Sequence, residues 1–180
     1  MSANLTSSKT DSLAFSQQKQ QFIGFSLKPD TAMILPIAGV TEVLKLALNR
    51  VVPIPQMPDW TMGVYNWRGE ILWMVDLGDL LGLDPWQQQN LNTSAATAII
   101  ISAPKGEKAK GLVKKSLGLI VPGVEDIEWC DPEDFQAVPA SATTPDMATL
   151  LTGYWLKPDG KMVLALDSDL IIDRLAMAEN

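Results

Sequence analysis

Two aspartates stand where carboxylate chemistry could take place. Asp76 and Asp167 each directly follow a run of five apolar residues. A pair of carboxylates in different environments can divide the roles of general acid and general base between them. The alternative is helix capping, because an aspartate side chain accepts hydrogen bonds from the first amides of a helix. Each aspartate precedes a Leu- or Ile-rich stretch, so we predict that both are helix caps.

Histidine is absent from the sequence. This removes the commonest general base and metal ligand, together with the phospho-accepting residue of a signalling kinase. Neither a Ser-His-Asp nor a Cys-His nucleophilic site can be assembled. The single cysteine, Cys130, can form neither a zinc site by itself nor an internal disulfide. We therefore predict a non-enzymatic protein without metal or cofactor.

A short turn carries the most distinctive polar residues. Asn66, Arg68 and Gly69 lie between two β-prone runs. We predict that Gly69 meets a conformational requirement and that the Asn66 amide satisfies the backbone of the turn. The role of Arg68 can be interpreted in two ways. Its guanidinium forms a salt bridge to Glu42 that stabilises the N-terminal part of the fold, or it contacts a partner directly. The two roles can coexist, and Glu42 shares the ambiguity.

The sequence contains an internal echo. Gly69–Asp76 and Gly160–Asp167 both consist of a glycine, a charged residue, five apolar residues and an aspartate. Both follow a β-prone stretch that opens on a glycine, Gly63 or Gly153. A turn glycine, a buried strand and a helix cap account for each part. The echo predicts two related lobes with equivalent hairpins; chance similarity between two ordinary hairpins is the alternative.

The remaining pattern is mostly of short strands separated by turns. A polar stretch over residues 1–20 predicts a disordered leader, and order is expected from Gln21. Residues 84–97 are rich in Gln and Asn and are interpreted as a link between two halves. We predict a first lobe over about 21–90, a second over about 97–166 and a C-terminal helix over about 168–178.

Charge and hydropathy exclude further classes. The net charge of −7 argues against a nucleic-acid partner, because phosphate backbones repel it. No apolar run is long enough to insert into a membrane, and the leader lacks the apolar segment of a signal peptide, so a cytoplasmic location is expected. One basic cluster is interpreted as a solvated hairpin tip or as a contact for an acidic partner: Lys105, Lys108, Lys110, Lys114 and Lys115.

Six tryptophans are many for 180 residues. Trp73 and Trp155 lie on predicted strands and are expected in the core. Trp60 and Trp86 lie beside prolines in predicted loops, where an aromatic side chain either packs against the loop or contacts a partner.

The segment from Gly63 to Leu77 resembles the signature of CheW-like domains: a glycine, an apolar residue, Asn-x-Arg-Gly, an apolar strand and Asp-Leu. Val40–Leu44 is similar to the short valine-glutamate segment of that family. Leu151–Gly153 and Met162–Asp167 are similar to its closing hairpin. The resemblance extends from Gln21 to about Leu175, and the Asn-x-Arg-Gly strand is its most specific part.

The resemblance implies a mainly β fold of two SH3-like five-stranded β-barrel lobes packed together, with short helices. It implies an adaptor that binds the regulatory domain of a CheA-type histidine kinase and the tip of a methyl-accepting chemoreceptor, recruited to membrane-associated receptor arrays. Arg68, Glu42 and Asn66 are the partner-binding or coupling residues it suggests. Gly69, Asp76, Gly160 and Asp167 are the structural ones.

Two departures from the family pattern affect the choice of partner: one is Trp73, which lies where a smaller apolar residue or proline is common, and the other is a pair of lysines. Lys114 and Lys115 lie where many members carry an acidic residue, and charge at a contact sets specificity more than affinity. An alternative function is a sensor that holds a small molecule in an apolar β-barrel. The sequence leaves open which surface meets which partner, and whether the pathway controls flagellar chemotaxis, pilus motility or phototaxis.

Overall fold

The computed structural model describes residues 18–27, 30–89, 94–103 and 116–178. Residues 1–17 of the predicted leader and the lysines between 104 and 115 lie outside this part of the chain. The described strands are β1 (Gln20–Ser26), β2 (Ala32–Pro36), β3 (Val40–Ala47), β4 (Thr61–Trp67), β5 (Glu70–Asp76), β6 (Ala95–Ser102), β7 (Ser116–Val121), β8 (Ile127–Cys130), β9 (Leu151–Leu156) and β10 (Met162–Leu166).

Helices are few and mostly short. The longest described helix is α4, whose bounds Ser168–Ala178 confirm the predicted C-terminal helix. The other α-helices are α1 (Leu77–Leu80), α2 (Trp86–Gln89) and α3 (Pro145–Ala148). Single 3-10 turns are η1 (Ile37–Gly39), η2 (Leu48–Arg50), η4 (Pro132–Asp134) and η5 (Ala140–Ala142).

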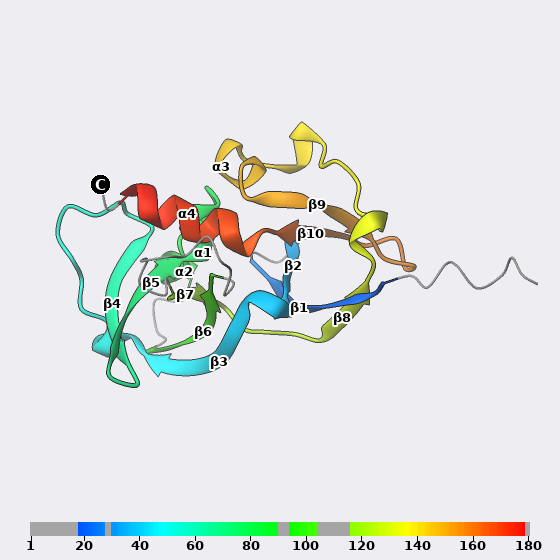
Figure 1. The fold of residues 1–180 in the computed structure, drawn as a ribbon. Coiled ribbons are helices and arrows are strands. Elements are labelled where there is room, and N and C mark those ends of the chain that lie inside the picture. The colour runs from blue at the N-terminus through cyan, green and yellow to red at the C-terminus, as the bar shows by residue number, and fades with distance from the viewer. Residues whose placement is uncertain (1–17, 28–29, 90–93, 104–115, 179–180) are drawn as a thin grey trace, which may run out of the picture.

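The strands form two five-stranded sheets that lie side by side (Figure 1). One has the order β8-β1-β2-β10-β9 and takes its strands from both ends of the chain; we call it the terminal barrel. The other has the order β3-β6-β7-β5-β4 and comes from the middle of the chain; we call it the central barrel. The predicted mainly β fold of two five-stranded lobes is confirmed.

The division of the chain between the lobes differs from the predicted one. The segments 21–90 and 97–166 each contribute strands to both sheets, so the two lobes are not successive halves. The cause is parallel pairing between distant segments: β10 pairs with β2, and β5 pairs with β7. Local periodicity shows where strands are but not which distant strands pair.

The two barrels share one topology. Reading across each sheet from β8 or β3, the first three strands pair antiparallel with one another in turn. The third strand then pairs in parallel with the fourth, and the fourth and fifth strands form an antiparallel hairpin. The predicted equivalent hairpins are therefore β4–β5 and β9–β10. Each barrel is also closed by one isolated bridge next to a glycine: Val52 pairs with Val64 beside Gly63, and Gln136 pairs with Tyr154 beside Gly153. The structure thus supports the echo as a structural equivalence.

Three hydrophobic clusters hold the fold together. The central barrel is filled around Trp67, Met74 and Ile100, and the terminal barrel around Phe22 and Ile34. The largest cluster lies between the barrels and includes α4; we call it the interlobe core. Its members include Phe25, Met33, Leu35, Val75, Leu77, Ile99, Ile101, Leu119, Leu164, Ile171 and Leu175. Burial of this shared surface makes the two barrels one unit.

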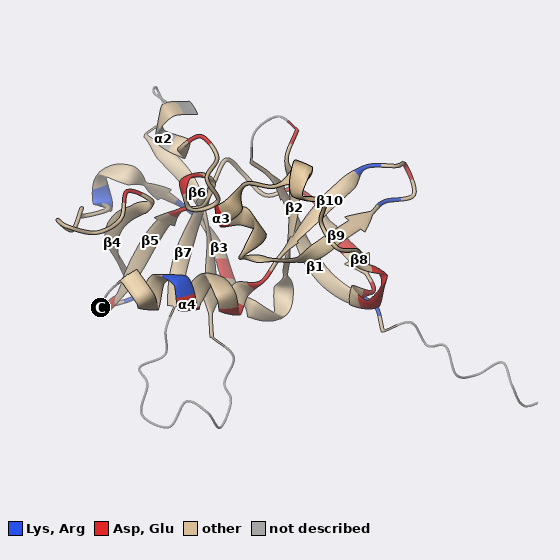
Figure 2. Ribbon diagram, turned by 90° about the horizontal axis from the view of Figure 1, so that it is seen from above, with Lys and Arg blue, Asp and Glu red and all other residues tan. Residues whose placement is uncertain are grey.

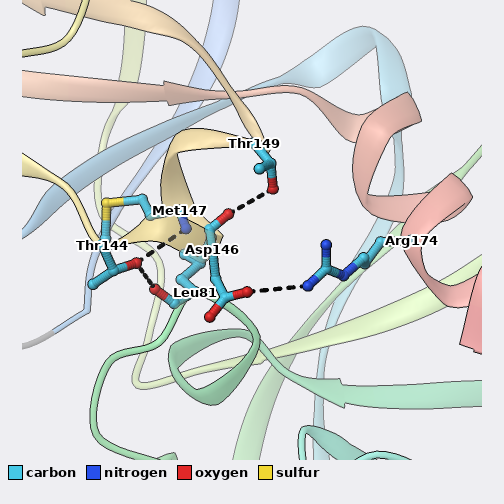
Figure 3. A network of polar contacts seen from close by, with 6 residues as sticks. All are labelled: Leu81, Thr144, Asp146, Met147, Thr149 and Arg174. Carbon is cyan, nitrogen blue, oxygen red and sulfur yellow. Dashed lines mark hydrogen bonds and ion pairs between the residues drawn. The ribbon is translucent and has the colours of Figure 1, made fainter. Parts of the chain in front are cut away.

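Polar contacts tie the helices across the two barrels (Figure 3). Thr144 caps α3 by accepting a hydrogen bond from the Met147 amide at 3.0 Å, and its hydroxyl donates to the Leu81 carbonyl after α1. Arg174 on α4 pairs with Asp146 of α3 at 3.0 Å. One side chain, Thr144, thus satisfies backbone groups of two helices that lie far apart in the sequence.

Candidate functional site

The tip of the β4–β5 hairpin is a two-residue turn. Arg68 has φ 54° and Gly69 has φ 85°, and Trp67 pairs with Glu70 on either side of them. Positive φ at both central residues gives the turn whose twist suits a hairpin. The Gly69 amide donates to Asn66 Oδ1 at 3.1 Å, which confirms the predicted role of the Asn66 side chain in the turn.

Arg68 and Glu42 form the predicted ion pair. Arg68 Nη2 lies 2.8 Å from Glu42 Oε2, so the hairpin tip is tied to edge strand β3. The Arg68 side chain is 69% exposed and that of Glu42 is 30% exposed. Water screens such a pair and limits its effect on stability, whereas most of the guanidinium stays open to a partner.

Trp67 completes the arrangement, and the sequence did not single it out. Its indole Nε1–H donates to Glu42 Oε2 at 3.2 Å, and its ring lies 5.1 Å from the Arg68 guanidinium carbon. The ring itself is buried in the central barrel. Glu42 Oε2 therefore accepts hydrogen bonds from both the charged Arg68 guanidinium and the neutral Trp67 indole. The guanidinium also lies against the face of the buried Trp67 ring. In the sequence, the alternation of Tyr65 and Trp67 along β4 is the feature that could have drawn attention to Trp67.

A similar pair closes the other barrel. Lys157, at the tip of the β9–β10 hairpin, pairs with Glu128 on edge strand β8. The hydrogen bond to Glu128 raises the pKa of Lys157, which keeps the ammonium charged. Glu128 lies further along its edge strand than Glu42 does, but the arrangement of hairpin cation and edge-strand glutamate recurs.

Exposed apolar side chains lie at matching positions of the two barrels. Ile71, the second residue after the turn glycine of the first hairpin, is 67% exposed; Met162 occupies the same position in the second hairpin and is also exposed. Val43 on β3 and Ile127 on β8 are a second matching pair of exposed residues. Val43 lies opposite Ile99 of β6, and Ile127 lies opposite Ile23 of the equivalent strand β1. Both barrels thus expose an apolar side chain at the same hairpin position and at the same edge-strand position.

The other predicted site residues have structural roles. Asp76 Oδ1 accepts from the Asp79 amide at 3.2 Å, and Asp76 Oδ2 accepts from the Trp86 amide at 2.7 Å. Burial raises the pKa of Asp76. Asp167 Oδ1 accepts from the Asp169 and Leu170 amides at the start of α4. Both aspartates are thus helix caps, as predicted, and they lie in different barrels.

Gly160 has φ 85° in the β9–β10 turn, as a turn glycine should. Of the two alternatives for Trp60 and Trp86, packing against the protein is the one that the structure shows. Trp86 is 5% exposed and fills the central barrel, while Trp60 packs partly buried against the interlobe core. Trp129 on β8 is instead the exposed one, at 56%.

Within the described residues, no group of three or more Cys, Asp or Glu side chains is arranged to hold a metal ion. None of the helices described is long and apolar enough to cross a membrane.

Comparison with known proteins assigns the family. A model of the CheW-like domain matches residues 21–176. The chain belongs to the CheW-like domain family. Membership identifies an adaptor or scaffold of chemotaxis signalling. No curated protein matches the sequence.

A solved structure supports the fold of this CheW-like domain. The scaffolding protein TtCheW from Thermoanaerobacter tengcongensis is similar with a TM-score of 0.64, at 23% sequence identity. The match covers 83% of this chain and 89% of that one. At this identity the similarity speaks for the fold, and the two SH3-like barrels are what it shares.

Proposed function

We propose that this CheW-like domain is a non-catalytic adaptor that links the regulatory domain of a CheA-type histidine kinase to the tip of a chemoreceptor. Family membership supports an adaptor in general. The sequence lacks histidine, so it offers neither a phosphate acceptor nor the commonest catalytic base. We place the protein in the cytoplasm, recruited to receptor arrays through these contacts.

The observation that carries the proposal is the exposed Arg68 guanidinium held by Glu42 and Trp67. A free arginine on a turn loses side-chain entropy when it binds a partner, whereas this one is already oriented. Its fork of donors suits a carboxylate or backbone carbonyls on the partner. Arg68, Glu42 and Asn66 therefore form one proposed contact.

An adaptor needs two contact surfaces, and the repeated topology offers them. The central barrel presents Val43 and Ile71 near its hairpin and edge strand, and the terminal barrel presents Ile127 and Met162 at the matching places. Two similar surfaces on two barrels allow two partners to bind at once. The sensor alternative is less well supported, because side chains of the described residues fill the interior of the central barrel.

Reconstitution of a signalling complex tests the proposal. Purified kinase, receptor fragments in a membrane mimic and this protein should form a ternary complex in which the kinase responds to receptor ligand. Omission of this protein should abolish the response. Arg68→Ala should weaken it, with Arg50→Ala as a matched control, since Arg50 instead stacks on Tyr65. A full response without this protein would contradict the proposal.

A further inference from the structure

Strand β8 is an edge of the sheet in the terminal barrel. It pairs with β1 on one side, and no strand of the described residues pairs with its other side. The Gly24 amide donates to the Asp126 carbonyl at 2.9 Å, which makes these two residues a hydrogen-bonded pair. Bonded and non-bonded pairs alternate along antiparallel strands, so Glu128 also bonds to β1, whereas Ile127 and Trp129 turn their N–H and C=O groups outward.

The two residues whose backbone faces outward also carry exposed apolar side chains. Ile127 is 52% exposed and Trp129 is 56% exposed. Side chains two positions apart on a strand lie on the same face of the sheet, so these two form one apolar surface. We call Ile127, Trp129 and the backbone between them the β8 edge. Outward backbone groups of an edge strand are a template for a further strand, and an exposed tryptophan is a common anchor of protein contacts.

Acidic side chains flank the β8 edge at both of its ends. Figure 2 shows them in red along β8 and in the turn after it, and four of them are exposed: Glu125, Asp126, Glu133 and Asp134. Glu128, between the two flanks, is already paired with Lys157. The negative field reaches Cys130, where burial raises the pKa of the thiol and the charges of Glu128 and Asp134 raise it further. Such a field repels an acidic segment and attracts a basic one.

These charges disfavour a second copy of the chain as the occupant of the β8 edge. Two β8 strands that paired antiparallel about Glu128 would place Glu125 of one copy opposite Asp131 of the other. The acidic residues before the edge in one copy would thus lie close to those after the edge in the other. Like charges directly opposite one another destabilise a strand pair. The same carboxylates leave the edge open to a strand of opposite charge.

We propose that the β8 edge binds an extended segment of a partner protein as an additional strand, and that this segment has apolar side chains at its centre and lysines or arginines at both ends. The β8 backbone supplies main-chain hydrogen bonds, Ile127 and Trp129 supply apolar contact, and the flanking carboxylates select for positive charge. Ile127 also belongs to a contact surface of the adaptor proposal, but binding of a basic strand requires neither the kinase nor the receptor.

Titration of the full chain with synthetic peptides tests the proposal. The probe has paired lysines at each end and valine-threonine-valine at its centre, and both of its termini are blocked. One control peptide has glutamates in place of the lysines. The other keeps the lysines and has prolines in place of the valines, which removes N–H groups that a strand needs for pairing. Isothermal titration should show that the probe binds at least about tenfold more tightly than either control peptide.

Amide hydrogen exchange of the wild-type protein identifies the edge that is bound. The probe should slow exchange at Ile127 and Trp129 at least about fivefold, because their outward N–H groups become bonded.

A pair of variants separates apolar contact from charge alone. Trp129→Ser should weaken binding of the probe at least about tenfold. Leu156→Ser is the matched control and should leave binding unchanged, since Leu156 is 50% exposed on β9, the opposite edge strand of the same sheet. Four results would each overturn the proposal: no detectable binding at about 1 mM, equal binding of the probe and the glutamate peptide, slowed exchange only outside β8, or equal losses from the two variants.

Discussion

Arg68 Nη2 lies 2.8 Å from Glu42 Oε2, and the Trp67 indole donates to the same oxygen. The contact joins a hairpin tip to an edge strand of its own barrel, at the open surface. Because the Arg68 side chain is 69% exposed, the pair restrains its guanidinium more than it stabilises the fold.

Removal of the Arg68 side chain should affect binding more than stability. Arg68→Ala is expected to change the free energy of unfolding by at most about 1 kcal/mol and to weaken kinase binding at least about tenfold. Arg68→Gly is the sharper variant, because it removes the same guanidinium while glycine prefers the positive φ of this position. Urea unfolding and calorimetric titration measure the two effects. Normal binding by both variants would make Arg68 a structural residue only.

Gly63, within β4, and Gly69, in the hairpin turn, should respond very differently to alanine. A Cβ on Gly63 would lie 2.1 Å from the Val52 carbonyl oxygen, whereas a Cβ on Gly69 would meet nothing within 4 Å. Gly69→Ala should cost about 1 kcal/mol, from its φ of 85° alone. Gly63→Ala should cost more than about 4 kcal/mol or prevent folding, because the bridge that closes the barrel must break. Gly123→Ala, with open space and no positive φ, is the control. Similar losses at Gly63 and Gly69 would contradict the account of barrel closure.

Asp76 should make stability depend on pH. Burial raises its folded-state pKa above the ordinary 3.8, so the unfolded chain releases this proton first as the pH rises. The contribution of the group to stability is therefore greatest below the unfolded-state pKa and is lost as the pH rises through the folded-state pKa. Relative to Asp76→Asn, the wild-type protein should lose stability as the pH rises above about 4. Urea unfolding of both proteins across this window measures the difference; a wild-type gain would have the wrong sign.

The Thr144 hydroxyl should matter more than the neighbouring ion pair. Thr144→Val removes the cap of α3 and the hydrogen bond to Leu81, at a cost of about 1–2 kcal/mol. Thr144→Ser should retain most of that stability. Arg174→Ala breaks only an exposed ion pair and should cost less than about 1 kcal/mol. Chemical denaturation orders the three variants, and a larger loss for Arg174→Ala would contradict the role of Thr144.

Cys130 should be inert while the protein is folded. Burial, reinforced by Glu128, Asp134 and Asp131, raises the pKa of its thiol to about 11. The reactive thiolate is thus scarce at pH 8, and the side chain is inaccessible. A thiol-specific chromogenic reagent should react slowly with native protein and rapidly in denaturant. Fast reaction of the native protein would mean that β8 opens readily.

The features predicted well from the sequence are local ones. Three features depend only on the backbone and side-chain preferences of a few adjacent residues. They are the Asn66–Gly69 turn, the two aspartate caps and the C-terminal helix. The division into lobes was wrong because it depends on which distant strands pair. The Trp67 bond to Glu42 and the burial of Trp86 likewise need the tertiary structure, since their partners lie on other elements.

The most direct test of the adaptor function is binding to the regulatory domain of a CheA-type kinase from the same organism. Isothermal titration of the two purified proteins should give a dissociation constant in the micromolar range, on the order of 1–10 μM. Arg68→Gly should weaken it at least about tenfold while the protein stays folded. No detectable binding at about 100 μM, roughly ten times the weakest expected constant, would contradict the account.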